Sequence, residues 1–244
     1  MSSSADALAE RKASTRASVK SALRRLSDDD MASQSAAISR HVLASLSAFA
    51  PDETRAPDAP PLRLGLYVHC AKLREVDTAP LLAAALAHPR AELYLPIVDV
   101  DPEKARTPSM RFLRVRSLDD DLEPKTMGIM EPKETLADGA PRENLDDAEG
   151  PLDVLLMPGL AFEPDGRRLG RGGGFYDAFL ERYEAKCASR GWTKPPFVAL
   201  AYDAQMLEPG VVPAGAHDRD VDAIATAKGI VTCTDAGRAA VRRE

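Results

Sequence analysis

Residues 152–180 read LDVLLMPGLAFEPDGRRLGRGGGFYDAFL, an order that predicts a buried strand, a polar loop and a helix. The apolar start of the stretch ends at a Pro-Gly turn, and helical spacing of apolar residues begins at Phe175. Between them, the loop carries these arginines and glycines: Arg167, Arg168, Gly170, Arg171, Gly172, Gly173 and Gly174. Glycines let a backbone approach a ligand closely, and the unpaired N–H groups of a first helical turn attract anions. The stretch therefore predicts a phosphate site.

This loop does not match the common nucleotide-binding motifs. No Gly-Lys-Ser/Thr closes it, as a Walker A loop requires. Counted from Gly170 or Gly172, the glycines also miss the GxGxxG spacing, which disfavours a Rossmann-type oxidoreductase. The alternative is a mobile surface loop whose arginines are solvated. The density of glycines and arginines favours the phosphate site over that alternative.

Composition narrows the class of protein. The chain has 244 residues and a net charge of -6, which disfavours a general nucleic-acid binder. No apolar run is long enough to span a bilayer, so we expect no membrane partner. The three cysteines are far apart in the sequence, which indicates reduced thiols rather than a disulfide framework or a zinc site. We expect a monomer in the cytosol, with the mitochondrion as the second choice.

The remaining chain alternates predicted strands and helices, which indicates an α/β fold with a mainly parallel central sheet flanked by helices. We expect one domain over residues 1–244, with surface loops at 51–61 and 133–150. Thr78 is the expected N-cap of a helix. Because sites in such sheets lie beyond the carboxyl ends of the strands, the predicted strand ends at Val68, Met157 and Tyr202 should meet. The predicted strands cover residues 62–68, 92–98, 110–115, 154–157, 197–202 and 223–226.

A basic stripe marks the predicted N-terminal helix. Lys12, Arg16, Lys20 and Arg24 follow one another at four-residue spacing, so they share one face. From the residues alone, a solvated helix face is the simpler interpretation.

Two segments within 152–180 resemble the signature of 5-formyltetrahydrofolate cyclo-ligases, also called 5,10-methenyltetrahydrofolate synthetases. The segments are Met157-Pro158-Gly159-Leu160-Ala161-Phe162 and Arg168-Leu169-Gly170-Arg171-Gly172-Gly173-Gly174-Phe175-Tyr176-Asp177. Weaker similarity runs from about Lys12 to Thr232. The resemblance implies ATP-dependent closure of 5-formyltetrahydrofolate to 5,10-methenyltetrahydrofolate, after the γ-phosphoryl group has been transferred to the formyl oxygen. A related protein that binds a nucleotide or pterin without cyclising it is the alternative.

The resemblance also implies which residues contact the ligands. Lys12 and Arg16 are expected to bind ATP, and Arg171 and Tyr176 are the expected catalytic residues. For Tyr176, simple packing at the helix start is the alternative. The expected ATP contacts in the loop are Arg168, Leu169, Gly170, Arg171, Gly172, Gly173, Gly174, Phe175 and Tyr176. The expected folate contacts are Cys70, Glu75, Arg171 and Phe175.

Magnesium is the expected cofactor, with Asp177 and Asp218 as its ligands by resemblance. A triphosphate site commonly holds Mg²⁺ with one or two carboxylates. From the residues alone, an acidic residue at a helix start is the commoner role for Asp177. One departure from the family pattern stands out, because many relatives carry Lys at the position of Gly173. One phosphate-binding cation is therefore expected to be missing here.

Overall fold

The computed structural model describes residues 4–51, 56, 58–99 and 109–242. The expected surface loop at 51–61 therefore lies partly outside the described residues. In the other expected loop, 133–150, most side chains between 134 and 141 are exposed, whereas Arg142, Leu145 and Ala148 are buried. That second segment is thus anchored to the core at its far end.

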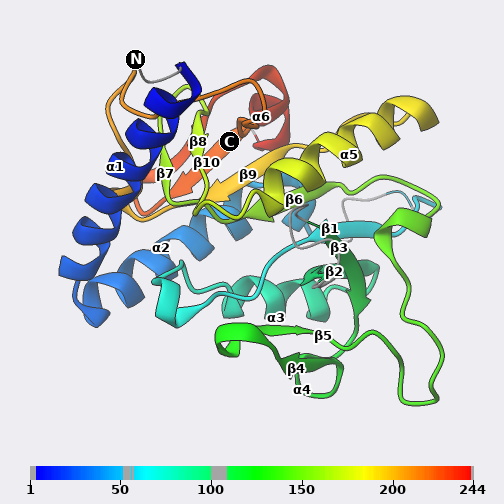
Figure 1. Cartoon of the computed structure of the whole chain (residues 1–244). Helices are drawn as coiled ribbons and strands as arrows, with labels where there is room; N and C mark the ends of the chain where they lie inside the picture. The colour runs from blue at the N-terminus through cyan, green and yellow to red at the C-terminus, as the bar shows by residue number, and fades with distance from the viewer. Residues whose placement is uncertain (1–3, 52–55, 57, 100–108, 243–244) are drawn as a thin grey trace.

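Within the described residues, a seven-stranded sheet runs in the order β11-β10-β9-β6-β1-β2-β3 (Figure 1). The inner strands β10, β9, β6, β1 and β2 are parallel, and each edge strand is antiparallel to its neighbour. The expectation of a mainly parallel sheet is confirmed. The strands are β1 (Leu62–Gly65), β2 (Ala91–Val98), β3 (Met110–Val115), β6 (Val154–Met157), β9 (Phe197–Leu200), β10 (Ala223–Thr226) and β11 (Gly229–Thr232).

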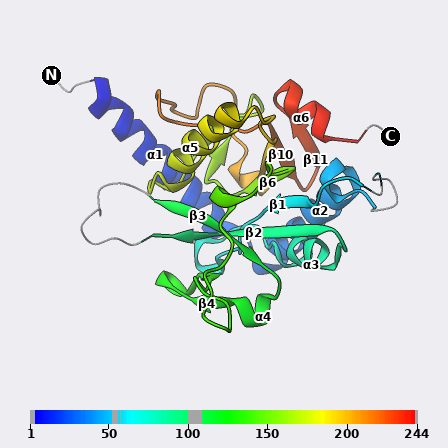
Figure 2. The ribbon, with the colours of Figure 1, turned by 90° about the vertical axis from the view of Figure 1, so that its right-hand side faces the viewer.

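Helices cover both faces of the sheet (Figure 2). On one face, Leu155 and Met157 of β6 share a buried cluster with apolar residues of α5. On the other face, Val154 and Leu156 belong to the cluster that contains residues of α1, α2 and α3. Because strand side chains alternate between faces, one strand serves both cores. The helices are α1 (Ser4–Arg25), α2 (Asp28–Ser45), α3 (Ala79–Ala87), α4 (Leu118–Asp121), α5 (Phe175–Arg190) and α6 (Asp235–Ala240).

The strand order reverses between β1 and β6. The chain passes from β1 through α3 to β2 on one side, and from β6 through α5 to β9 on the other. Loops that leave the carboxyl ends of two such strands diverge and open a crevice between them. Two small antiparallel sheets flank this region: β4 (Leu122–Pro124) with β5 (Met130–Pro132), and β7 (Ala161–Phe162) with β8 (Arg168–Leu169).

Two local predictions need correction beside this crevice. The predicted strand 62–68 ends as β1 at Gly65. Leu66 N still donates to Tyr94 O of β2, and Tyr67 and Val68 then line the crevice. Thr78 occupies the N-cap position of α3 but its side chain does not cap the helix. Its hydroxyl instead donates to Tyr67 O at 2.8 Å and accepts from His69 N at 3.2 Å. The Thr78 hydroxyl therefore bonds to the backbone of Tyr67 and His69 instead of to the first turn of α3.

Thr78→Val should test this role. The substitution keeps the shape of a fully buried side chain but removes the partner of a backbone carbonyl and of a backbone N–H. We expect the free energy of unfolding in urea to fall by about 1–3 kcal/mol. Thr126→Val, at an exposed position, is the control and should change it by less than about 0.5 kcal/mol. Equal stability of Thr78→Val and the parent would contradict the assignment.

Candidate active site

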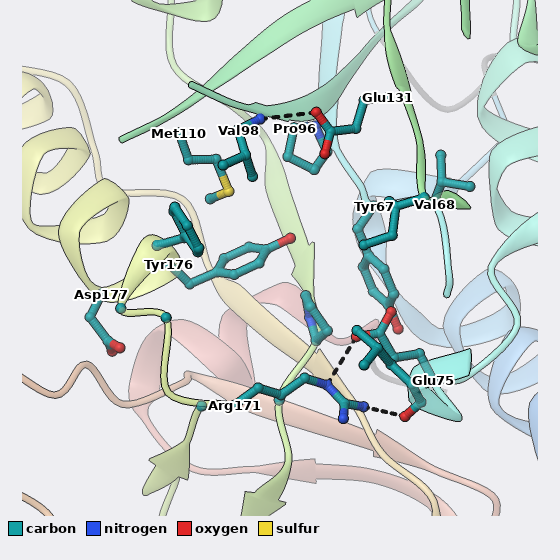
Figure 3. A pocket seen from close by; sticks show the side chains of 18 of the residues that line it. Tyr67, Val68, Glu75, Pro96, Val98, Met110, Glu131, Arg171, Tyr176 and Asp177 are labelled. Carbon is teal, nitrogen blue, oxygen red and sulfur yellow. Dashed lines mark hydrogen bonds and ion pairs between the residues drawn. The ribbon is translucent and has the colours of Figure 1, made fainter. Parts of the chain in front are cut away.

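Two cavities meet at the crevice, separated by the glycine-rich loop 170–174. The first has a volume of about 300 Å³ and mostly apolar walls (Figure 3). The second, of about 340 Å³, is lined mainly by polar and charged residues. Gly170, Gly174 and Asp177 line both. A group held in one cavity therefore lies next to a group held in the other, with only this loop between them.

Two glycines allow the backbone conformation of this loop. Gly172 has φ +114° and Gly174 has φ +71°, backbone conformations that L side chains rarely adopt. Gly174 is the N-cap of α5 and no side chain caps this helix. The N–H groups of its first turn, together with the positive end of the helix dipole, are thus available to an anion. This is the arrangement predicted from residues 152–180.

The second cavity gathers cations from α1 beside carboxylates from the C-terminal half. Lys12 Nζ donates to Asp218 Oδ1 and Oδ2 at 2.6 and 2.5 Å. Arg16 Nε donates to Gly170 O at 2.9 Å, which ties α1 to the loop. Glu181 and His217 complete the polar wall. Lys12 and Arg16 of the basic stripe therefore line the second cavity, whereas Lys20 lies outside it.

A nearly buried ion pair holds the two ends of the loop together. Arg168 on β8, with a side chain 2% exposed, donates to Asp177 Oδ1 at 2.5 Å. The same oxygen accepts from Arg219 N at 3.2 Å. Since Arg168 precedes the glycines and Asp177 follows them, their contact fixes the span of the loop.

Arg171 points into the first cavity rather than the second. Its Nε donates to Glu75 Oε1 at 3.1 Å and its Nη2 donates to Leu73 O at 2.6 Å (Figure 3). Cys70 N donates to the other oxygen of Glu75 at 2.9 Å. Burial raises the pKa of the Glu75 carboxyl, while the Cys70 N–H and Arg171 act in the opposite direction. The guanidinium and this carboxylate thus form a charged pair at one end of an apolar cavity.

The turn that carries Glu75 has an anchor that sequence reasoning missed. Arg74 has φ 52°, and among the described residues it is the one non-glycine residue with positive φ. Its guanidinium donates to Leu23 O at 2.8 Å and to Leu26 O, at the C-terminal end of α1. This end of a helix carries free carbonyl groups and a negative partial charge, so it favours a cation. Arg74 therefore links the helix of the second cavity to a wall of the first.

Three aromatic side chains line the first cavity together with more numerous aliphatic ones. Tyr176 and Tyr67 enter it from different sides (Figure 3). Burial raises the pKa of each phenol, so both stay neutral near pH 7. Phe175 also lines this cavity, and a Cβ at Gly173 would come within 2.7 Å of its ring. The absence of a side chain at Gly173 thus leaves room for Phe175.

Most of the residues expected at the site are brought together, and two stand apart. Leu169 is buried on β8 and lines neither cavity; its carbonyl accepts from Leu160 N. The buried Cys70 contributes its backbone N–H to Glu75 rather than a lining side chain. Glu131 on β5 lines the first cavity and was not among the residues expected to contact a ligand.

The second cavity suits a magnesium ion bound with phosphate. Asp177 and Asp218 supply oxygen ligands on the same cavity, and Mg²⁺ commonly uses one or two carboxylates while phosphates and water complete its octahedron. No group of three or more His, Cys, Asp or Glu residues suited to a metal occurs in the described ranges, so an all-protein cage is not formed there. Lys12 would have to exchange Asp218 for a phosphate group.

Comparisons with known proteins agree on one family. A sequence model of the 5-formyltetrahydrofolate cyclo-ligase family matches residues 8–227. The chain is 41% identical over 172 residues to the mitochondrial 5-formyltetrahydrofolate cyclo-ligase of Arabidopsis thaliana, covering 69% of this chain and 60% of the relative. It is 34% identical over 134 residues to the Escherichia coli K12 cyclo-ligase, covering 55% and 63%. The matched segments thus span less than two thirds of these relatives.

The fold is also found in a solved structure. A 5,10-methenyltetrahydrofolate synthetase from Mycoplasma pneumoniae superposes with a TM-score of 0.55 at 17% identity, covering 88% of this chain and 98% of that one. In the part of the chain that is described, no helix has the length and apolar character needed to cross a membrane.

A pair of glycine substitutions should show which glycine the loop requires. Gly172→Ala places a Cβ at φ +114°, so we expect the free energy of unfolding to fall by about 1–3 kcal/mol. Gly170→Ala is the matched control, since a Cβ there meets side chains at ordinary distances of 3.5 and 3.9 Å. Its stability should change by less than about 0.5 kcal/mol. Chemical denaturation measures both, and equal losses would contradict the backbone argument.

Proposed function

Because the chain belongs to the 5-formyltetrahydrofolate cyclo-ligase family, we propose that it closes 5-formyltetrahydrofolate to 5,10-methenyltetrahydrofolate at the expense of ATP. One observation carries the proposal. A single glycine-rich loop separates an apolar cavity suited to a flat ring system from a polar cavity suited to a triphosphate. Such an arrangement places a phosphoryl donor and its acceptor side by side.

The folate occupies the first cavity. Its aromatic walls, including Tyr67 and Tyr176, suit the pterin ring, and the paired Arg171 and Glu75 lie at one end. An apolar cavity with few polar groups both orients a ligand and excludes water from it. Exclusion of water protects the phosphorylated intermediate from hydrolysis.

ATP occupies the second cavity, with its γ-phosphate at the glycine-rich loop. Lys12 and Arg16 neutralise phosphate charge from one side, and the first-turn N–H groups of α5 do so from the other. Asp177 and Asp218 would hold magnesium, which supplies charge neutralisation on the triphosphate. Binding of the nucleotide frees Asp218, because Lys12 then contacts phosphate instead.

The reaction follows from the poor reactivity of a formamide. Its oxygen attacks the γ-phosphorus and ADP leaves, which turns that oxygen into a good leaving group. N10 then attacks the formyl carbon, the carbon–oxygen bond to phosphate breaks, and N10 loses its proton. The chain's own contribution is to position the two substrates and to stabilise the transferred charge through Arg171 and the helix N-terminus.

One assay tests the proposal directly. Purified protein is mixed with 5-formyltetrahydrofolate, and the absorbance of the methenyl product is followed with and without ATP and magnesium. We expect product only when all three are present. Release of ADP and phosphate in equal amounts to product should accompany it. If both ligands bind but no product forms, the protein is a binder and the cyclo-ligase proposal is wrong.

The basic residues of α1 should act on the nucleotide alone. Lys12→Ala and Arg16→Ala should each raise the KM for ATP roughly 10- to 100-fold, because each removes a charged contact worth about 1.5–3 kcal/mol. The KM for the folate should stay within about twofold. Lys20→Ala and Arg24→Ala on the same helix are matched controls that should leave both values unchanged. Parallel losses for both substrates would contradict the assignment.

Magnesium dependence should reveal the two carboxylates. Asp177→Asn and Asp218→Asn should lower turnover steeply at limiting magnesium while leaving folate binding nearly intact, since an amide oxygen carries little of the charge that a hard cation requires. Excess magnesium should partly restore each single variant. The double variant should fall little further, because groups that act as a unit are not additive.

Asp235→Asn, which alters an exposed pair with Arg238 on α6, is the control for a general effect of charge removal. If Asp218→Asn has normal turnover at limiting magnesium, the two-carboxylate arrangement is wrong. If Asp177→Asn fails to respond to magnesium and also unfolds more easily, its role is confined to holding Arg168.

A further inference from the structure

One carboxylate in the first cavity lacks a partner that accounts for its burial. Glu131 on β5 is 8% exposed, and its Oε2 accepts one hydrogen bond, from Val98 N at 3.2 Å. No ion pair to Glu131 and no further hydrogen bond to it is formed within the described ranges. Burial raises the pKa of this carboxyl; the Val98 N–H and, through space, Lys125 act in the opposite direction without cancelling the effect.

Glu131 and Glu75 lie at opposite ends of the cavity (Figure 3). Glu75 is already neutralised by Arg171, as described above. Within the cavity, the side chains beside Glu131 are those of Pro96, Val98 and Met110, none of which can donate a strong hydrogen bond (Figure 3). Lys125 lies outside this cavity and is paired with Glu123. Inside the cavity, a ligand that fills this end would therefore supply the donors that the protein side chains lack.

Burial of the Glu131 carboxylate favours a ligand that donates hydrogen bonds to it. A carboxylate removed from water loses its hydration, and the loss is offset only when donors replace the water. Each carboxylate oxygen can accept more than one hydrogen bond, so Val98 N leaves acceptor capacity on Oε2 and all of it on Oε1. The best match is a flat, apolar-faced ring with two adjacent N–H donors on one edge, because it satisfies both oxygens in a bidentate contact.

We propose that Glu131 recognises the pyrimidine edge of the pterin ring, by accepting hydrogen bonds from its 2-amino group and its N3–H. The inference rests on the proposed function, since it takes the occupant of the first cavity to be the folate. The 2-amino-4-oxopyrimidine edge presents these two donors side by side. With this edge at Glu131, the formyl-bearing side of the ring faces the glycine-rich loop, where the phosphoryl group arrives.

If Glu131 only held the backbone of Val98 in place, its side chain would need fewer acceptor atoms than ligand recognition requires. Holding Val98 N requires a single acceptor, which the carbonyl oxygen of glutamine supplies as well as a carboxylate does. Recognition of two donors requires both oxygens, and the NH₂ of glutamine would face a donor of the ligand. Glu131→Gln therefore separates the two roles without a change in size.

The kinetics of Glu131→Gln test the proposal. We expect the KM for 5-formyltetrahydrofolate to rise roughly 10- to 100-fold, since a hydrogen bond to a charged group contributes about 1.5–3 kcal/mol. The turnover number should stay within about threefold and the KM for ATP should not change, because Glu131 lies away from the glycine-rich loop. Glu123→Gln is the matched control: Glu123 pairs with Glu131 across the β4–β5 hairpin, is more exposed, and contacts Lys125. It should behave as the parent does.

A substrate analogue identifies the group that Glu131 contacts. In the parent protein, replacing the 2-amino group of 5-formyltetrahydrofolate by hydrogen should weaken binding at least tenfold in a calorimetric titration. Glu131→Gln should bind the two compounds within about threefold of each other. Equal sensitivity of parent and variant to the missing amino group would overturn the inference, as would an unchanged KM in Glu131→Gln.

The outcome for the parent separates this inference from the proposed function. If the parent neither binds nor converts 5-formyltetrahydrofolate, both proposals fall together. If the parent converts it and Glu131→Gln matches the parent, only the role of Glu131 is wrong. Thermal unfolding of the variant should match that of the parent, and a loss of ATP binding along with folate binding would indicate a structural role instead.

Discussion

The contact between Arg168 and Asp177 is the constraint on which the site depends. It joins the two ends of the glycine-rich loop. The glycines have no side chains to hold them, so this ion pair keeps the loop in place. A guanidinium that is 2% exposed needs a carboxylate partner, and that requirement fixes the first turn of α5 against β8. The free N–H groups of this turn then point in one direction only. Electrostatics at the base of the loop thus determines where an anion can bind.

The two cavities share parts and are therefore not independent. Arg16 connects α1 to the loop, the loop carries Arg171 into the first cavity, and Arg74 connects the turn of Glu75 back to α1. Together these contacts link α1, the glycine-rich loop and the turn of Glu75 to one another around the crevice. Lys12 and Asp218 meet in the polar cavity, and the helix that carries Lys12 also supports a wall of the apolar cavity through Arg74. Under the proposed function, two substrates that react with each other would be bound by one connected framework.

Local sequence was sufficient for the features that depend on local geometry. The strand, loop and helix within 152–180 follow from periodicity and glycine content, and the mainly parallel sheet follows from alternation of elements. Features that depend on distant partners were not predictable. The hydroxyl of Thr78 is taken by Tyr67, and Glu131 is buried only because β5 packs against β2. Sequence likewise places Arg171 between glycines but cannot show that its side chain turns toward Glu75.

The contact between Lys12 and Asp218 joins positions 206 residues apart, which has a consequence for the order of events during synthesis. Since synthesis runs from the N-terminus, α1 leaves the ribosome well before the carboxylate that meets its lysine, with 206 positions between the two. Contacts of such long sequence separation form late because the intervening chain must first be ordered. A growing chain therefore carries this basic helix without its partner until the residues between them have been made. The polar cavity is complete only after Asp218 has emerged and folded against α1.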